Sequence, residues 1–319
     1  MKILVTGGSG FIGRAICSRL VADGQDDVSR AVRSAAAGIP QVTDVPIGDI
    51  GPDTDWARGL AGIDAVVHAA ARVHVTHESA EDSLAEYRRV NVAGTVNLAR
   101  QAAAAGVRRL VFISSIKVNG ERTPVGRAFS ADDPPAPAGA YARSKCEAET
   151  ALRELAQAGG MEVVVIRPPL VYGPGARANF LRLLRWIDRG LPLPFGRVRN
   201  RRSLVALPNL VDLVATCIRH PAAANQVLTV CDGEDVSTPE LATRIAAAMQ
   251  REIRLLPVPV WLLRGLASLA GKGPMAERLL GSLQVDMAKT RQLLQWSPVV
   301  SMQTALEQAV GDYLRHSSA

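Results

Sequence analysis

The sequence of 319 residues predicts an α/β fold of the doubly wound class, in which helices cover both faces of a parallel sheet. Short β-branched apolar runs alternate with longer Ala-rich stretches as far as Arg167, and a glycine-rich turn joins the first run to the first Ala-rich stretch. After Arg167 the chain becomes rich in Pro and Gly. We therefore expect one domain over residues 1–167 and a smaller region over residues 168–319, some elements of which return to the first domain.

The period of the apolar residues and the capping signals place the individual elements. Strands are predicted at Lys2–Thr6, Val28–Val32, Ala65–His68, Arg109–Ser114, Glu162–Arg167 and Gln226–Val230. Helices are predicted at Phe11–Ala22, Ser83–Ala105, Tyr141–Ala158, Leu210–Arg219 and Pro239–Met249. Ser237 or Thr238 is expected to cap the last helix. Strands that alternate with helices in this way pair in parallel through right-handed crossovers.

Composition and charge narrow the class of protein. The formal net charge is +7, but the basic residues are scattered, only 4% of residues are aromatic, and no nucleic-acid-binding motif is present. We therefore favour a small polyanionic ligand over nucleic acid. The four cysteines form no C-x-x-C pair, so neither a disulfide framework nor a metal site is expected. The first apolar run is too short for a signal peptide or a spanning helix, so we expect a cytoplasmic protein without an integral membrane segment.

Residues 6–13 read Thr-Gly-Gly-Ser-Gly-Phe-Ile-Gly and lie between the first strand and the first helix. Gly7 permits a tight turn, Gly10 lets the backbone approach a pyrophosphate, and Gly13 lets the helix pack closely on the strand. The N–H groups near Phe11 and Ile12 carry the partial positive charge of a helix N-terminus. A strand–turn–helix with incidental glycines is the alternative, but the position favours a Rossmann-type dinucleotide-binding turn.

The residue that follows the second strand bears on the choice between NAD and NADP. NAD-specific folds often have an acidic residue there, which binds the ribose hydroxyls. Here the residue is Arg33, whose guanidinium can bind a 2′-phosphate, so we favour NADP over NAD. The alternative is that Arg33 is only a solvent-exposed side chain. Asp49 can accept a hydrogen bond from the adenine amino group, or it can be a simple turn residue.

Tyr141 and Lys145 lie four residues apart and therefore on one face of the predicted helix. A neighbouring cation favours the phenolate, so we expect Lys145 to lower the pKa of Tyr141 and make it a general acid–base. Ser114 and Ser115 follow a core strand at the sheet edge where ligands bind, and a hydroxyl there can polarise a carbonyl. A surface Tyr/Lys pair and turn-forming serines are the alternatives, but three such signals in this order favour a catalytic site.

With these motifs the chain resembles the extended short-chain dehydrogenase/reductase family, the NAD-dependent epimerases and dehydratases. Further support comes from His68-Ala69-Ala70-Ala71, Asn91-x-x-Gly94-Thr95, Arg167-Pro168-x-x-Val171-Tyr172-Gly173-Pro174 and Trp296-Ser297-Pro298. The resemblance implies that Ser115, Tyr141 and Lys145 are catalytic, with Ser114 as the rival of Ser115, and that Asn91 braces the site. It implies cofactor contacts from Gly7, Gly10, Phe11, Ile12, Gly13, Arg33, Asp49, Ile50, Ala70, Ala71, Tyr141, Lys145 and Pro168.

The resemblance also places a nucleotide-sugar substrate, with UDP as the expected nucleotide, in the second region. Asn179 and Arg202 are implied to bind its diphosphate, and Ser114 and Ser115 to contact its sugar. By family habit the chain is expected to form a homodimer. Asn179 is otherwise a helix cap, and Arg202 is otherwise one solvated arginine in an Arg-rich loop.

The sequence around residues 114–121 and 167–174 is similar to bacterial surface-polysaccharide enzymes that reduce the C4 ketone of UDP-4-keto-6-deoxy-N-acetylhexosamines. We therefore expect a 4-ketoreductase. A UDP-sugar 4-epimerase with tightly bound NAD is the alternative, and a dinucleotide-binding sensor without catalysis is an alternative of another class. A dehydratase is disfavoured because Ile116 and Lys117 stand where such enzymes carry an Asp-Glu pair.

Residues 258–269 form an apolar stretch that contains one charged residue, Arg264. We favour a buried helix or a subunit contact for this stretch. The other interpretation is association with a membrane surface.

Overall fold

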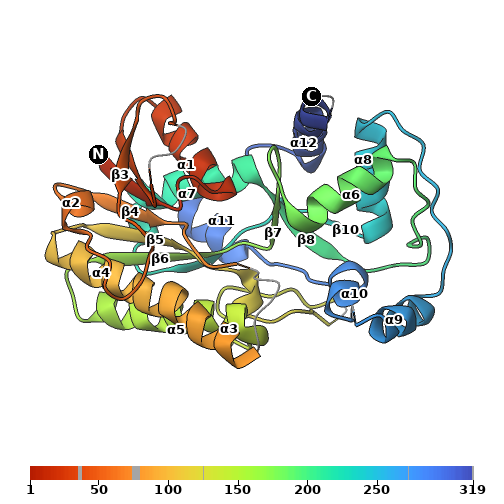
Figure 1. The fold of residues 1–319 in the computed structure, drawn as a ribbon, viewed down its shortest axis with the longest axis horizontal. Helices are drawn as coiled ribbons and strands as arrows, with labels where there is room; N and C mark the ends of the chain where they lie inside the picture. Colours follow the sequence, from red (N-terminus) through yellow and green to blue (C-terminus); the bar gives the residue numbers. More distant parts are fainter. Residues whose placement is uncertain (35–37, 74–79, 125, 272, 318–319) are drawn as a thin grey trace.

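The computed structural model describes residues 1–34, 38–73, 80–124, 126–271 and 273–317. Within these residues the large sheet has seven parallel strands in the order β3-β2-β1-β4-β5-β6-β9 (Figure 1). They are β1 Lys2–Thr6, β2 Asp27–Val32, β3 Val42–Pro46, β4 Ala65–His68, β5 Arg109–Ile113, β6 Glu162–Arg167 and β9 Val227–Thr229. The predicted doubly wound fold is confirmed. The strand order reverses between β1 and β4, which is where such sheets bind ligands at their carboxyl ends.

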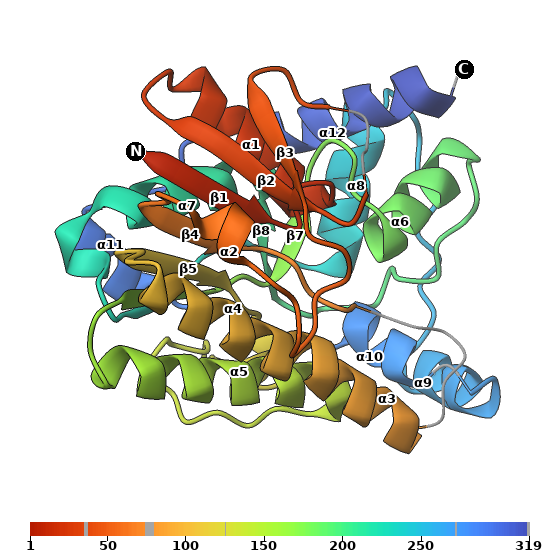
Figure 2. The same cartoon turned by 60° about the vertical axis from the view of Figure 1, so that its left-hand side comes forward.

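Helices cover both faces of this sheet because successive strand residues point to opposite sides. Ile3 and Val5 face one core, whereas Leu4 faces the other. The helices over the face with Ile3 and Val5 are α1 Phe11–Ala22, α7 Leu207–Arg219 and α11 Ala288–Leu294. The helices over the face with Leu4 are α2 Ala57–Leu60, α4 Gly94–Ala104 and α5 Gly139–Gln157. Figures 1 and 2 show α1 and α7 on one side of the sheet, with α4 and α5 on the other.

The rest of the second half builds a second core, separate from the two faces of the large sheet, around a small sheet. In this sheet β8 pairs in parallel with β7 and antiparallel with β10. Its strands are β7 Leu170–Tyr172, β8 Arg202–Ala206 and β10 Asp235–Val236. The helices around it are α6 Ala178–Asp188, α8 Thr238–Ala248 and α12 Met302–Ser317. Because β9 pairs with β6, the chain returns to the large sheet before it enters α8.

Two further helices lie together at the edge of this second core, α9 Val260–Leu269 and α10 Gly273–Leu280 (Figure 1). The short helices η2 Ile116–Val118 and η3 Pro221–Ala223 complete the set of elements in the described chain, apart from the α3–η1 segment. None of the helices in the described residues is both long and apolar enough to cross a membrane.

The long helix predicted at Ser83–Ala105 is interrupted. The structure has α3 at Ala80–Tyr87, a π-helical turn η1 at Arg88–Ala93, and then α4. A π turn holds one more residue than an α turn, and such turns are frequent at functional sites. In this turn Asn91 is buried and faces α5.

Most predicted boundaries are accurate to within three residues. Local signals explain this accuracy, as at α8, where Ser237 is the N-cap of a capping box that includes Glu240. The strand predicted at Gln226–Val230 is shortened to β9, and the strand predicted as far as Ser114 ends at Ile113. Ser114 directly follows β5, and its N–H still donates to the Ile166 carbonyl of β6 at 2.8 Å.

A buried ion pair fixes α5 against the end of β6. The Arg167 guanidinium donates through Nε to Glu149 Oε1 at 3.0 Å and through Nη2 to Glu149 Oε2 at 2.6 Å. Ser114 Oγ donates to Glu149 Oε1 at 2.5 Å, and Arg167 Nη1 donates to Asn119 Oδ1 at 3.1 Å. Both members of the ion pair are buried, so removal of Glu149 leaves the charge of Arg167 uncompensated in the protein interior.

We therefore expect Glu149→Ala to lower the free energy of unfolding by about 3–5 kcal/mol. Urea unfolding followed by circular dichroism measures the change. Glu147→Ala is the matched control, because Glu147 lies on the same helix but pairs with Arg88 at the surface. The control should leave stability nearly unchanged. Equal losses in the two variants would show that the buried pair has no special structural role.

Candidate active site

The glycine turn forms a cradle at the carboxyl end of β1. Gly7 has a φ of +68°, and a Cβ at this position would lie 2.7 Å from the backbone nitrogen of Ala70. A Cβ on Gly13 would collide with the Gly7 carbonyl, so α1 can only pack this closely if residue 13 is glycine. Gly10 is the N-cap of α1, and no side chain caps it. The helix N-terminus is therefore available to phosphate, which fits a dinucleotide.

The other predicted cofactor residues surround this cradle to different degrees. Phe11 and Ile12 begin α1 and are half-buried, as are Ala70 and Ala71 after β4. Pro168 is buried after β6, and its carbonyl accepts a hydrogen bond from the Ile116 N–H at 3.0 Å. These positions line the carboxyl edges of β1, β4 and β6, the strand ends that bind a dinucleotide in this fold.

Arg33 and Asp49 lie apart from these buried positions. Their side chains are 83% and 82% exposed, and the closest approach between the guanidinium and the carboxylate is 4.0 Å. Ile50 packs against the backbone of Gly94 instead. The buried arginine of β2 is Arg30, which binds Asp44 through two hydrogen bonds. The exposed Arg33 side chain can thus turn toward a 2′-phosphate. That it selects NADP over NAD stays a prediction.

The structure brings Ser115, Tyr141 and Lys145 together at the end of β5. Tyr141 and Lys145 lie one turn apart near the start of α5, and the Ser115 side chain lies close enough to the Tyr141 phenol to lower its pKa. Ser115 and Tyr141 both line a cavity described below. Ser114 is not among the residues that line this cavity, because its hydroxyl is held by Glu149. The geometry therefore favours Ser115 over Ser114 as the residue that contacts substrate.

Burial dominates the protonation of the catalytic pair. It raises the pKa of Tyr141 to about 12, with a further rise from Tyr87, while the Ser115 hydrogen bond opposes the shift. Burial lowers the pKa of Lys145 to about 7, while Glu149 opposes that shift. The Lys145 ammonium lies 4.1 Å from the centroid of the Phe112 ring. The expectation that Lys145 lowers the pKa of Tyr141 is wrong for this structure, since burial raises that pKa and Lys145 is not among the causes of its shift.

A hydrogen-bonded relay connects the glycine cradle to the catalytic helix. Thr6 at the end of β1 pairs with His68 at the end of β4, and Thr6 Oγ lies 2.6 Å from His68 Nδ1. His68 Nε2 lies 2.9 Å from Thr95 Oγ, which donates to the Asn91 carbonyl at 2.7 Å. Since the Thr95 hydroxyl proton is used, Nε2 must donate to Thr95. Burial disfavours a second proton on the ring, so His68 is neutral and Nδ1 accepts from Thr6.

Asn91 extends this relay to α5. Its Nδ2 donates to Ser144 Oγ at 3.0 Å, and Ser144 Oγ donates to the Tyr141 carbonyl at 2.8 Å. Its Oδ1 accepts from the Arg72 N–H at 2.8 Å, which ties the chain after β4 to the same point. The bracing role that the family resemblance implied for Asn91 is confirmed in this geometry.

The cavity beside Ser115 and Tyr141 has a volume of about 320 Å³ and lies between the large sheet and the second core. Predicted residues Asn179 and Arg202 are both part of its wall. The remaining residues of the wall are mostly apolar: Val73, Ile116, Pro169, Leu170, Val171, Phe180, Leu183, Leu204, Val236, Leu241, Leu279 and Leu283, with Lys117, Ser237, Thr238 and Arg278. A concave, largely apolar cavity with a few converging polar groups is typical of a small-molecule site.

Three cations converge on this cavity. Lys117 and Arg202 are partly buried, and Arg278 lies close enough to lower the pKa of each. For Arg202, burial is the larger cause and the pKa falls to about 10. Burial is also the main cause that lowers the pKa of Lys117. Glu121, whose carboxylate lies 3.6 Å from the Lys117 ammonium, opposes this shift. Cations that destabilise one another attract a polyanion, because its charge relieves their repulsion.

Several of these residues were not predicted from the sequence as site residues. Arg278 had no signal, because it sits in a short helix that the apolar period did not reveal. Lys117 was noted only as a departure from the dehydratase pattern. Thr6, His68 and Ser144 belong to motifs that were recognised, but their contacts depend on strand register and on the π turn. Only the folded arrangement brings these groups to the site.

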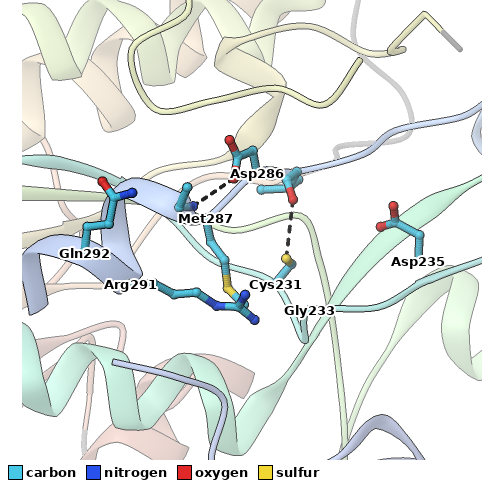
Figure 3. Close-up of a pocket in the computed structure, with 9 residues that line it drawn as sticks. Cys231, Gly233, Asp235, Asp286, Met287, Arg291 and Gln292 are labelled. Carbon is cyan, nitrogen blue, oxygen red and sulfur yellow. Dashed lines mark hydrogen bonds between the residues drawn. The ribbon is translucent and has the colours of Figure 1, made fainter. Parts of the chain in front are cut away.

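A second cavity, of about 330 Å³, lies near α11 and contains none of the predicted site residues in its wall (Figure 3). Cys231, Asp286 and Arg291 contribute to it, and the Cys231 thiol donates to the Val285 carbonyl at 3.5 Å. Neither Ser115 nor Tyr141 is among its lining residues, whereas both line the first cavity, so we assign the chemistry to the first cavity.

The relay predicts a specific pH dependence of stability. Burial lowers the pKa of His68 to about 3 from an ordinary value of 6.5. Between these values the unfolded chain binds a proton that the folded chain does not, so stability falls as the pH drops from 6.5 toward 3. The contribution of His68 to this loss should reach about 1.4 kcal/mol per pH unit.

His68→Gln should remove this contribution, which urea unfolding at pH 7, 6, 5 and 4 measures. His316→Gln is the control, because it removes an exposed imidazole near the C-terminus. If the difference in stability between the wild type and His68→Gln does not change with pH, His68 is not held neutral by the fold.

Comparison with known proteins places this site in a family. The sequence matches the NAD dependent epimerase/dehydratase family over residues 3–231. A UDP-glucose 4-epimerase of Vibrio cholerae is 46% identical over 315 residues, which cover 98% of this chain and 96% of the relative. An N-acetyl-alpha-D-glucosaminyl-diphospho-ditrans,octacis-undecaprenol 4-epimerase of Escherichia coli O157:H7 is 28% identical over 282 residues, 85% of this chain and 81% of the relative.

A solved structure agrees with the fold. UDP-glucuronic acid 4-epimerase from Bacillus cereus in complex with NAD superposes with a TM-score of 0.80 over 99% of both chains, at 21% identity. These relatives do not support the finer expectation of a special likeness to 4-ketoreductases, because all three are epimerases by name. The chain belongs to the NAD dependent epimerase/dehydratase family.

Proposed function

We propose that this protein is a UDP-sugar 4-epimerase that works with a dinucleotide held in the β1–α1 cradle. The observation that carries the proposal is that one cavity joins Ser115 and Tyr141 to the cations Lys117, Arg202 and Arg278. A nucleotide sugar has the matching shape, since a diphosphate separates its sugar from its base. The name of the Vibrio cholerae relative, at 46% identity, supports the epimerase over the 4-ketoreductase expected from the sequence.

The residues of this chain divide the work between binding and proton transfer. The nicotinamide, when bound, supplies the hydride chemistry at C4 of the sugar. The Tyr141 hydroxyl exchanges a proton with the C4 oxygen, and the Ser115 hydroxyl, which lines the same cavity, hydrogen bonds to that oxygen. Lys145 brings a positive charge to the same buried site when it is protonated, which its pKa near 7 permits at neutral pH.

The wall of the cavity also disfavours dehydration. A dehydratase needs an acid and a base beyond the Tyr141 site, and carboxylates commonly fill these roles. Among the described residues that line the cavity, none is Asp or Glu. Ile116 and Lys117 occupy the two positions after Ser115, in the 3₁₀ helix η2. A lysine there binds anions or donates hydrogen bonds, so it does not replace a carboxylate base.

A 4-ketoreductase remains the second candidate, because two observations favour it. Burial keeps the Tyr141 phenol protonated at neutral pH, which suits a residue that donates a proton to a reduced ketone. Arg33 stands exposed after β2 and can reach a 2′-phosphate, which suits NADPH as a consumed reductant. A sensor without catalysis is disfavoured by the presence of Ser115, Tyr141 and Lys145 in one site.

The test is to incubate the purified protein with UDP-glucose or UDP-N-acetylglucosamine and to follow the sugar by NMR. An epimerase interconverts the C4 epimers without net change in nicotinamide absorbance. Stoichiometric loss of NADPH absorbance with a UDP-4-keto sugar, and no epimerisation, would replace the proposal with the reductase. Mass spectrometry of the cofactor that co-purifies identifies NAD or NADP independently.

Tyr141→Phe should reduce kcat by about 10²–10⁴-fold, because it removes the proton-transferring hydroxyl and keeps the ring. Tyr87→Phe is the matched control, since the Tyr87 ring packs edge-on against Tyr141 with centroids 6.2 Å apart. The control should change kcat far less. An active Tyr141→Phe enzyme would refute the assignment of Tyr141 as the acid–base.

Arg202→Ala and Arg278→Ala should each weaken the binding of UDP about 10- to 100-fold, because each removes a charged partner of the diphosphate. Isothermal titration calorimetry with UDP alone measures this loss without any turnover. Arg201→Ala is the control, because Arg201 neighbours Arg202 but is exposed and outside the wall of the cavity. If Arg201→Ala weakens the binding of UDP as strongly, the loss reflects the lower net charge of the protein, and the proposed diphosphate site is wrong.

A further inference from the structure

The helix α9 exposes an apolar surface that neither the catalytic site nor the two cores explain. Trp261 is 74% exposed, Leu266 is 56% exposed and Leu269 is 88% exposed, and Leu262 is exposed as well. None of the residues of α9 is buried, so the expectation of a buried helix for residues 258–269 is wrong. Contiguous exposed apolar side chains on one helix usually mark an interaction surface.

The helix is nevertheless held in a defined position. Val260 and Leu263 pack against the second core from the inner side of α9. Arg264 pairs with Glu277 of α10 at 3.2 Å, and α9 and α10 lie side by side in Figures 1 and 2. The outer apolar face is therefore presented by a helix that is fixed to the protein on its other side.

Charge around this face distinguishes the partners that it can take. The described residues 251–271 and 273–281 contain four basic residues, Arg251, Arg254, Arg264 and Arg278, and two acidic ones, Glu252 and Glu277, a net charge of +2. The whole chain carries +7. Two copies of this face would place like charges together, whereas an anionic lipid headgroup layer is attracted by them. The charge therefore favours a membrane surface over a second copy of the chain.

We propose that α9 docks the protein on the surface of an anionic lipid bilayer. The helix lies in the plane of the headgroups, Trp261, Leu266 and Leu269 enter the acyl boundary, and Arg251 and Arg254 contact lipid phosphates. Because α10 carries Arg278 and Leu279 into the wall of the catalytic cavity, docking through α9 sets that cavity beside the membrane surface.

The test is co-sedimentation of the full-length protein with vesicles of phosphatidylcholine and phosphatidylglycerol in equal parts, and with phosphatidylcholine alone. We expect binding to the anionic vesicles, weakened by salt, and a blue shift of tryptophan fluorescence. The triple variant Trp261→Ser/Leu266→Ser/Leu269→Ser should lower the apparent partition coefficient at least about tenfold. The fluorescence shift should be lost with Trp261→Phe, because Trp261 is the tryptophan that α9 contains.

The matched control is Trp186→Ser/Leu191→Ser/Leu293→Ser, which removes three apolar side chains that are exposed elsewhere on the molecule. It should bind vesicles like the wild type. Both triple variants should keep the wild-type circular dichroism spectrum and the wild-type turnover of UDP-sugars free in solution, which separates docking from the proposed catalytic function.

Two results would overturn the proposal. One is equal vesicle binding by the wild type and the α9 triple variant. The other is no vesicle binding by the wild type, with an oligomer in analytical ultracentrifugation that the α9 triple variant loses, which would identify a second copy of the chain as the partner.

Discussion

The neutral imidazole of His68 is the link on which the arrangement of the site depends. It lies at the carboxyl edge of the sheet, next in register to Thr6 on one side and to Phe112 on the other, and its ring stacks on Phe112 with centroids 5.7 Å apart. The relay thus begins at Thr6, beside the glycine cradle, and ends at Ser144 of α5. Every donor in it has one acceptor, which makes such a buried network specify a single arrangement. The catalytic helix and the dinucleotide cradle are therefore positioned by the same set of hydrogen bonds.

The two ends of the cavity have opposite electrostatic characters. Beside Ser115 and Tyr141, burial raises the pKa of the Tyr141 phenol and lowers the pKa of Lys145, so charge is disfavoured there. At the other end, the cationic side chains of Lys117, Arg202 and Arg278 lie near one another. A ligand with an uncharged reactive end and an anionic end fits this polarity in one orientation only. The polarity of the cavity thus supplies direction as well as affinity.

The sequence was sufficient to predict features that depend on local signals, and insufficient to predict features that depend on tertiary contacts. Alternating apolar strands and the Gly7–Gly13 turn determine the large sheet, and the Tyr141–Lys145 spacing determines a shared helix face. The pKa values of that pair depend on burial, which spacing cannot reveal. The choice between Ser114 and Ser115 depends on the buried Glu149, which holds the Ser114 hydroxyl while Ser115 lines the cavity, and this contact spans 35 positions of the sequence. A Leu-rich stretch such as α9 has the composition of a buried helix, and only the absence of a neighbour on its outer side in the described chain shows otherwise.

The π turn η1 has a consequence for changes in chain length. Successive residues of an α-helix are rotated by about 100° around its axis. Shortening Arg88–Ala93 by one residue would restore a regular α-helix, and local helix propensity would improve. The side chains on the two sides of the deletion would then change phase relative to each other. Asn91 would swing away from Ser144 while α4 stayed packed on the sheet. The extra residue in this turn therefore sets the direction in which Asn91 points. Without it the helix would be more regular, but Asn91 would no longer hold α5 in place.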